Sequence, residues 1–490
     1  MPMTELNRRE LLKLALMGTA GSMVPLEAAV PEHANTKIKE VARLGPRDFP
    51  PGFFLGAGTS SYQVEGAAAL DGRGPSIWDS FCRIPGRVKH GDNGDMADDQ
   101  YHLYKDDVQL LKRLGAKAYR FSTSWSRILP TGTGQVNQVG LDYYHRLVDE
   151  LLASGITPFL TLFHWDLPQA LQDRWSGWQS RDTSVAFADY AAVVAKALGD
   201  RVKHLFTTNE ILSFTDLGHA QGEHAPGLKL EAKARNQVRH HGVLAHGLGV
   251  QAIRANAPKD VLVGPAENPW PALPVFETTE HIAAARKAMR LLNAPFLTAI
   301  MEGAYTPEYL QTEGANAPRF TQEDMKAIGS KVDYVGLNLY FPSHVRAADN
   351  AQGFAVVEDP PSYPHMDVAW LKFGPQITYW VPRFLNELWR MPTIISENGC
   401  CGTDALVGGE VYDTDRVMYL REHFLQAQRA TAEQIPLKGY FVWSLLDNFE
   451  WSEGFSKRYG IVHVDFKSQK RTLKLSARYF REVALAHRVL

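Results

Sequence analysis

The sequence has little cysteine, no excess of either charge and no long apolar run, and each of these features excludes a class of protein. Three cysteines among 490 residues are too few for a disulfide framework, and Cys400 and Cys401 are neighbours, so free thiols are expected. The chain has 52 Lys and Arg against 54 Asp and Glu, a net charge of −2. Without a positive field to attract a polyanion, no nucleic-acid partner is expected.

Patterns that bind metals or nucleotides are also missing. No Cys/His spacing fits a zinc site, and His240-His241 is interpreted as a polar helix face. Gly56-Ala57-Gly58 lacks the third glycine of a dinucleotide fingerprint, and no helical pattern follows it at once. We therefore expect neither a metal nor another cofactor.

Residues 1–30 have the layout of an export signal, in which charged residues precede an apolar run. The run, 14–26, is shorter than the about 20 residues that span a membrane. The pair Arg8-Arg9 resembles the bacterial twin-arginine signal of proteins exported already folded. These features predict a periplasmic or secreted protein, with residues 31–46 as a short leader and no membrane association of the mature chain. A frayed amphipathic N-terminus is the alternative.

Residues 47–490 alternate short β-rich runs with longer amphipathic helical patterns, without a Gly/Ser-rich or Pro-rich linker. Eight such β/α units predict a single α/β domain, a (β/α)₈ TIM barrel, rather than a doubly wound open sheet. Long connections such as 341–367 are expected to form active-site loops. The expected strands are 53–59, 117–124, 157–163, 203–208, 260–265, 332–338, 392–397 and 438–444.

Two glutamates stand where strands of the barrel are expected to end. Glu210 follows the fourth strand and Glu397 ends the seventh, so both should face the mouth where barrel enzymes carry their chemistry. Glycosidic bond cleavage needs such a pair, because one carboxyl protonates the leaving oxygen and the other attacks the sugar or activates water.

Aromatic and polar side chains are expected at the same mouth. His164 and Trp165 follow the third strand, while Trp443, Glu450 and Trp451 follow the eighth. Indole rings stack on the apolar face of a pyranose, and His and Glu form directional hydrogen bonds with its hydroxyls. The pattern favours a sugar-binding site.

Six motifs together resemble glycoside hydrolase family 1, the retaining β-glucosidases and their relatives. The resemblance covers about 47–481 of the chain. Its motifs are 58–66 (GTSSYQVEG), 119–122 (YRFS), 163–168 (FHWDLP), 209–210 (NE), 396–399 (SENG) and 439–451 (GYFVWSLLDNFEW).

The resemblance implies a role for each matching residue. Glu210 would be the acid/base and Glu397 the nucleophile that forms a covalent glycosyl-enzyme intermediate. Arg120 and Tyr340 would hydrogen-bond the nucleophile, and Asn338 would support Glu210. The small β-glycoside substrate would be bound by Gln63, His164, Trp165, Asn209, Trp370, Trp443, Glu450, Trp451 and Tyr459.

The chain departs from the family pattern beside both glutamates and near the sugar rim. Ile211 replaces a Pro after Glu210, Ser396 replaces a Thr before Glu397, and Tyr459 stands where Phe is common. None of these changes removes a reacting group.

Three functions are compared. The expected one is a β-glucosidase that releases terminal β-D-glucosyl or related residues with retention, with a use in carbohydrate metabolism such as cellulose degradation. A 6-phospho-β-glycosidase is disfavoured because Glu450 would repel a phosphate. A non-catalytic sugar-binding barrel is disfavoured because both carboxyl groups are present.

Overall fold

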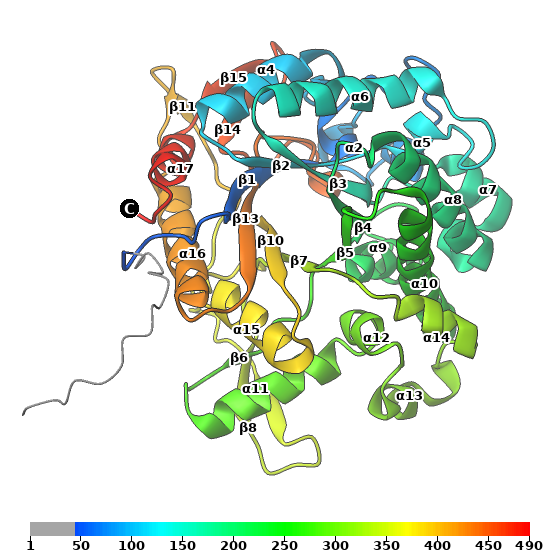
Figure 1. Cartoon of the computed structure of the whole chain (residues 1–490), viewed down its shortest axis with the longest axis vertical. Coiled ribbons are helices and arrows are strands. Elements are labelled where there is room, and N and C mark those ends of the chain that lie inside the picture. The colour runs from blue at the N-terminus through cyan, green and yellow to red at the C-terminus, as the bar shows by residue number, and fades with distance from the viewer. Residues whose placement is uncertain (1–44) are drawn as a thin grey trace, which may run out of the picture. The chain divides into compact units, whose positions relative to one another are not determined.

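The computed structural model describes residues 45–490 as a closed barrel of parallel strands surrounded by helices (Figure 1). The expected export signal, 1–30, and the leader up to residue 44 lie outside the described residues. Among the helices that are described, none combines the length and apolarity needed to cross a bilayer.

Eight strands close the barrel in the order β1-β13-β10-β7-β5-β4-β3-β2, and every barrel pairing is parallel. The predicted fold is thereby confirmed, with each expected strand within a few residues of its observed place. The barrel strands are β1 (Phe54–Gly58), β2 (Ala118–Ser122), β3 (Thr157–Phe163), β4 (His204–Asn209), β5 (Leu262–Glu267), β7 (Val335–Asn338), β10 (Thr393–Asn398) and β13 (Leu437–Trp443).

Side chains fill the inside of the barrel, so it is a packed core rather than a pore. Strand residues alternate between this interior and the layer beneath the helices, which makes the strands apolar on both faces. The interior cluster consists of Ala118, Phe159, Phe206, Ala266, Tyr334, Ile394 and Phe441.

Helices cover the outside of the barrel (Figure 1), and long ones such as α4 (Gln100–Arg113), α6 (Gln138–Ala153) and α8 (Arg181–Leu198) bury apolar residues spaced three and four apart. The other long ones are α10 (Ala232–Asn256), α11 (Thr279–Leu292), α15 (Ile377–Trp389), α16 (Thr414–Ala432) and α17 (Leu475–Ala486). The short ones are α2 (Ser61–Val64), α3 (Ile77–Cys82), α5 (Trp125–Ile128), α7 (Gln169–Trp175), α9 (Ile211–Asp216), α12 (Leu297–Glu302), α13 (Pro307–Glu313) and α14 (Gln322–Ile328).

Connections at the mouth contain small sheets that the sequence patterns did not reveal. The 341–367 connection, expected as a loop, holds β8 (His344–Ala347) and β9 (Phe354–Val357), which pair with β6 (Leu273–Pro274). Two further hairpins are β11 (Leu406–Val407) with β12 (Glu410–Val411), and β14 (Val462–Asp465) with β15 (Lys470–Leu473).

The interpretation of His240-His241 as a polar helix face is wrong. Both lie on α10 but are buried, at 1% and 7% exposure. His240 Nδ1 hydrogen-bonds the Tyr305 hydroxyl at 3.0 Å, and His241 Nδ1 bonds the Trp178 carbonyl oxygen at 2.9 Å. His241 Nε2 also hydrogen-bonds the Gln237 amide nitrogen at 3.1 Å. Because the partners of both Nδ1 atoms lie on other segments, helical spacing alone did not reveal the burial.

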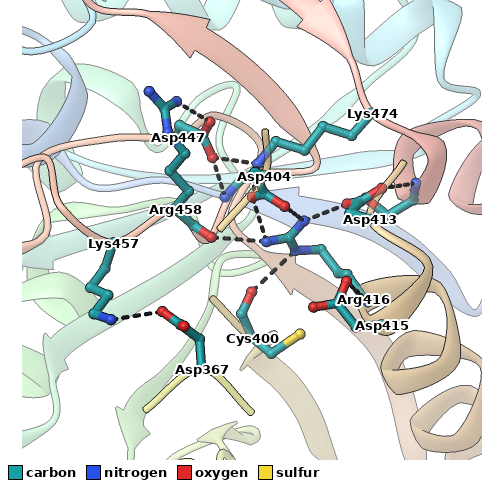
Figure 2. A network of polar contacts seen from close by, with 12 residues as sticks. Asp367, Cys400, Asp404, Asp413, Asp415, Arg416, Asp447, Lys457, Arg458 and Lys474 are labelled. Atoms are coloured by element: carbon teal, nitrogen blue, oxygen red, sulfur yellow. Dashed lines mark hydrogen bonds and ion pairs between the residues drawn. The ribbon is translucent and has the colours of Figure 1, made fainter. Parts of the chain in front are cut away.

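A buried guanidinium joins segments that are far apart in the sequence (Figure 2). Arg416, at the start of α16, binds both oxygens of Asp404, at 3.0 and 2.7 Å, and also pairs with Asp413. Its Nε donates to the carbonyl oxygen of Cys400 at 3.1 Å, and its Nη2 to that of Arg458 at 2.8 Å. Burying an unpaired guanidinium would be costly, but each N–H group of Arg416 donates to an acceptor.

Lys474 extends this network to the loop that follows β13 (Figure 2). Its ammonium lies 2.5 Å from Asp404 and 2.6 Å from Asp447, and all three side chains are buried. Asp447 also binds Arg458 at 2.6 Å. The network therefore braces Cys400, three residues beyond Glu397, and Asp447, three residues before Glu450.

Removing Arg416 should destabilise the protein strongly. Because Asp404 and Asp413 would be left buried beside fewer cations, we expect Arg416→Met to lower the free energy of unfolding by about 3–5 kcal/mol. The matched control is Arg83→Met, which breaks the exposed Arg83–Asp95 pair and should cost less than about 1 kcal/mol. Urea denaturation of both variants measures the difference, and equal losses would show that the network contributes no more than a surface pair.

Candidate active site

A cavity of about 580 Å³ opens where the barrel strands end. It brings together side chains from six barrel strands or the residues directly after them, as expected for a site at the carboxyl face of a barrel. Twelve of the fourteen predicted site residues line it, namely His164, Trp165, Asn209, Glu210, Asn338, Tyr340, Trp370, Glu397, Trp443, Glu450, Trp451 and Tyr459.

Glu397 lies at the end of β10 against a buried cation. Arg120, on β2, is fully buried and donates from Nη1 to Glu397 Oε1 at 2.5 Å. The Tyr340 hydroxyl donates to the other carboxyl oxygen at 2.8 Å. Burial raises the pKa of Glu397, while the charge and hydrogen bonds of Arg120, then Tyr340, act against that rise. Both oxygens of Glu397 are therefore held in place by donors.

Glu210 follows β4, and within residues 45–490 no cation lies at hydrogen-bond distance from its carboxyl. Asn338, the last residue of β7, donates its amide Nδ2 to Glu210 Oε1 at 2.8 Å. Burial raises the pKa of Glu210 to about 7, and the negative charge of Glu397 adds to the rise. A carboxyl with this pKa can both give and accept a proton near neutrality.

Two amides link the surroundings of the two glutamates. Asn209 Oδ1 accepts from Arg120 Nη2 at 2.6 Å and from Asn338 Nδ2 at 3.0 Å. Ser396 Oγ donates to Asn338 Oδ1 at 2.6 Å, which fixes the orientation of that amide. Ser396 thus supplies the hydroxyl that the family's usual Thr would also carry.

Aromatic rings form one side of the cavity. His164 and Trp443 stack with ring centres 5.6 Å apart, and Trp165 and Trp451 lie 4.6 Å apart. Trp165 Nε1 donates to the Asn209 carbonyl oxygen at 3.0 Å, which anchors that indole beside the strand end. Burial, then the charge of Arg120, lowers the pKa of His164 well below its usual value, so the ring is neutral and can hydrogen-bond a sugar hydroxyl.

Glu450 faces the cavity from the loop after β13. Gln63 Nε2 donates to its Oε2 at 3.3 Å and to the Phe449 carbonyl oxygen at 2.9 Å. Burial raises the pKa of Glu450 to about 8, and the charge of Glu397 adds to this. Gln63 and Arg120 are the two predicted site residues that do not line the cavity; each lies behind a carboxyl and positions it.

Two aromatic residues of the cavity wall, Trp370 and Tyr459, pack against Tyr340. Trp370 is 54% exposed, and its ring centre lies 6.2 Å from that of Tyr340. Tyr459 is buried and packs edge-on against Tyr340, with ring centres 6.5 Å apart. The cavity wall therefore includes an exposed indole, that of Trp370, as well as the two buried carboxyls.

Sequence reasoning missed several residues of the cavity wall. Asn268 follows β5 directly, a strand whose end carries no motif, and Lys457 lies in the same loop as Glu450. Lys457 binds Asp367 at 2.7 Å, a pairing that joins two distant loops and has no local sequence signal. Position after a strand end was the signal that could have identified Asn268.

The chemistry available to this arrangement is acid–base and nucleophilic. Two buried carboxyl groups face one cavity, one hydrogen-bonded by a cation and a phenol, the other by a neutral amide. Over the described residues, no group of three or more His, Cys, Asp or Glu is placed to hold a metal ion. Cys82, Cys400 and Cys401 are free and buried.

Solved structures with the same fold are close to this chain in sequence. A family 1 β-glucosidase from Thermotoga maritima superposes with a TM-score of 0.82 at 41% identity, over 91% of this chain and 99% of that one. The same enzyme in complex with glucoimidazole gives 0.82 at 42% identity, over 90% and 99% of the two chains.

Sequence comparisons give the same result. A 1,4-β-D-glucan glucohydrolase from Thermotoga neapolitana is 43% identical over 89% of this chain and 98% of its own length. β-Glucosidase A from Thermotoga maritima shows the same identity over the same shares. The family described as Glycosyl hydrolase family 1 matches residues 46–489. This match confirms the resemblance seen in the motifs, and the chain belongs to glycosyl hydrolase family 1.

Proposed function

We propose that the cavity hydrolyses small β-glucosides with net retention, with Glu397 as nucleophile and Glu210 as acid/base. The β-glucosidase activity follows from family membership and from relatives of that name over nearly their full length. The observation that supports the two roles is the asymmetry of the carboxyl environments. Arg120 stabilises the charged form of Glu397, whereas Glu210 has a pKa of about 7 beside a neutral amide.

The first step would break the glycosidic bond. Glu397 attacks the anomeric carbon and forms a glycosyl ester, while Glu210 gives its proton to the departing oxygen. Because the pKa of Glu210 is about 7, the proton-carrying form decreases as the pH rises through that value. Cleavage of bonds with poor leaving groups is expected to fall with it.

The second step would release the sugar. Glu210, now ionised, takes a proton from water as the water oxygen attacks the anomeric carbon and the ester to Glu397 breaks. The two inversions give net retention. Stacking on Trp443 and hydrogen bonds from His164 and Glu450 would hold the ring in place through both steps.

A glucoside substrate is supported by what solved relatives bind. The Thermotoga maritima enzyme has been solved in complex with deoxynojirimycin and with glucoimidazole, both small molecules. A use in cellulose degradation is proposed on the name of the Thermotoga neapolitana relative, a 1,4-β-D-glucan glucohydrolase.

A phosphorylated sugar is a weaker candidate. Lys457 lines the cavity and could attract a phosphate, but Asp367 already binds its ammonium at 2.7 Å. Glu450 stands in the same loop and would oppose a dianion whenever it is ionised. A non-catalytic barrel would not need two carboxyls with such different surroundings.

The leaving group should separate the roles of the two glutamates. Glu210→Ala should nearly abolish cellobiose cleavage yet spare glycosylation by a dinitrophenyl glucoside, whose phenolate leaves without a proton. Turnover should then stall at the glycosyl ester, and azide, which needs no base, should restore it and give a β-glycosyl azide.

Glu397→Gly is the companion variant. Loss of the nucleophile should impair every substrate, and azide entering the vacated space should give the α-azide by a single inversion. NMR of the two azide products decides the assignment. Anomers in the reverse order would mean that the roles of Glu210 and Glu397 are exchanged.

Glu450→Ser should weaken activity on unmodified glucosides. Each hydrogen bond between Glu450 and a sugar hydroxyl contributes about 0.5–1.5 kcal/mol while the carboxyl is neutral and about 1.5–3 kcal/mol once it is ionised, so loss of more than one such bond should lower kcat/KM by roughly tenfold. Steady-state kinetics on p-nitrophenyl β-glucoside measures the loss. A variant as active as the wild type would make Glu450 a structural residue and reopen the phospho-sugar alternative.

Export is proposed from residues 1–30 alone. Arg8-Arg9 before a weakly apolar run supports transport of the folded protein. Replacing both arginines with lysine should leave active enzyme in the cytoplasm of the expressing bacterium. Activity assays of periplasmic and cytoplasmic fractions test this, and undiminished export of the double variant would reduce the motif to coincidence.

A further inference from the structure

A third buried carboxyl, Glu267, lies next to Glu210 and takes no part in the mechanism above. It is the last residue of β5 and is only 2% exposed. It does not line the cavity, so it is not placed to touch the substrate. Its contact is instead with the backbone directly after Glu210.

The end of β5 binds the chain on both sides of Glu210. The Glu210 N–H donates to the Ala266 carbonyl oxygen at 2.7 Å. The next N–H, that of Ile211, donates to Glu267 Oε2 at 3.2 Å. One step further along, Asn268 Nδ2 donates to Ser213 Oγ at 2.8 Å. Consecutive residues 266, 267 and 268 thus hold consecutive parts of the segment that begins with Glu210.

This segment needs holding because Glu210 has an unfavourable backbone conformation. Its φ of 51° lies in the left-handed region, which a side chain other than glycine rarely adopts. Such a conformation persists where surrounding contacts enforce it. The peptide between Glu210 and Ile211 follows directly, so a contact at the Ile211 N–H controls where the Glu210 carboxyl points.

The need for an acceptor at this point comes from the residue at position 211. The family commonly has Pro after the acid/base residue, and Pro has no N–H and fits the first position of a helix. Ile211 begins α9 and therefore brings a buried N–H that needs an acceptor. We propose that Glu267 is a positioning residue for Glu210, accepting the N–H that Ile211 introduces in place of the family's Pro.

The environment of Glu267 fits an acceptor role. Burial raises the pKa of Glu267 well above its usual value, the Ile211 N–H acts against this, and the charge of Glu210 adds to it. The neutral form is favoured, so Glu267 adds no second negative charge beside Glu210. A glutamine would have nearly the same shape and would keep the accepting oxygen.

The test compares two substrates that differ in their need for an acid, and it rests on the acid/base role proposed for Glu210. In Glu267→Leu, the Ile211 N–H loses its acceptor, so kcat/KM for cellobiose should fall by about tenfold or more. For the dinitrophenyl glucoside it should change by less than about threefold, since no proton is needed.

Two further variants identify the contact. Glu267→Gln keeps the acceptor and should retain kcat/KM for cellobiose within about threefold. Adding Ile211→Pro to Glu267→Leu removes the donor as well and should restore cellobiose cleavage to within about threefold of the wild type. If Glu267→Leu does not fold, the double variant still tests the proposal. A double variant that folds but does not recover cellobiose cleavage contradicts it.

Asp324→Leu is the matched control. Asp324 is also a buried carboxyl that accepts a backbone N–H, that of Thr321 at 3.0 Å, at the start of α14. Its loss should lower the melting temperature and leave the ratio of the two kcat/KM values unchanged. The inference is overturned if Glu267→Leu behaves like this control, or if Glu267→Gln loses cellobiose cleavage as Leu does.

Failure of the proposed function would look different. If Glu210→Ala itself showed no dependence on the leaving group, Glu210 would not be the acid and the roles above would fail. If Glu210→Ala shows that dependence and Glu267→Leu does not, only the positioning by Glu267 is contradicted.

Discussion

One buried cation among several carboxyl groups is the constraint on which the site depends. Glu210, Glu267 and Glu397 are nearly inaccessible, and Glu450 is only partly exposed. An unpaired buried carboxylate is costly by several kcal/mol, so these groups cannot all be ionised without compensation. Arg120 compensates one of them, Glu397, at 2.5 Å. The pKa values of Glu210 and Glu450 rise to about 7 and about 8 mainly because they are buried without such a partner.

The barrel turns this constraint into a division of roles. Arg120 stands on β2 and reaches across the barrel interior to Glu397 on β10, while Asn209 accepts from its other nitrogen. Asn338 then hydrogen-bonds both Asn209 and Glu210. Arg120 hydrogen-bonds Glu397, whereas the neutral amide of Asn338 hydrogen-bonds Glu210. The ionised form is therefore stabilised more at Glu397 than at Glu210. The polar groups that achieve this come from separate strands, so strand register sets the difference.

The sequence predicted the barrel and its main residues because both leave local signals. Alternation of β-rich and helical runs identifies eight units, and strand ends identify Glu210 and Glu397. Interactions between distant segments leave no such signal. The burial of His240, the pairing of β8 with β6 and the Lys457–Asp367 pair depend on partners far away in the sequence. Glu267 was missed because the expected strand, 260–265, ended two residues before it, whereas β5 continues to Glu267.

The effect of a departure from the family pattern depends on the residues that it contacts in the folded structure. Ile211 in place of Pro changes no reacting group, but it adds a buried backbone N–H that needs a hydrogen-bond acceptor. The acceptor comes from the adjacent strand, 56 residues later in the chain. At this position beside the proposed acid/base residue, the neighbouring strand supplies the acceptor for the added N–H. The same reasoning applies to Ser396, whose hydroxyl keeps the bond to Asn338 that orients the amide beside Glu210.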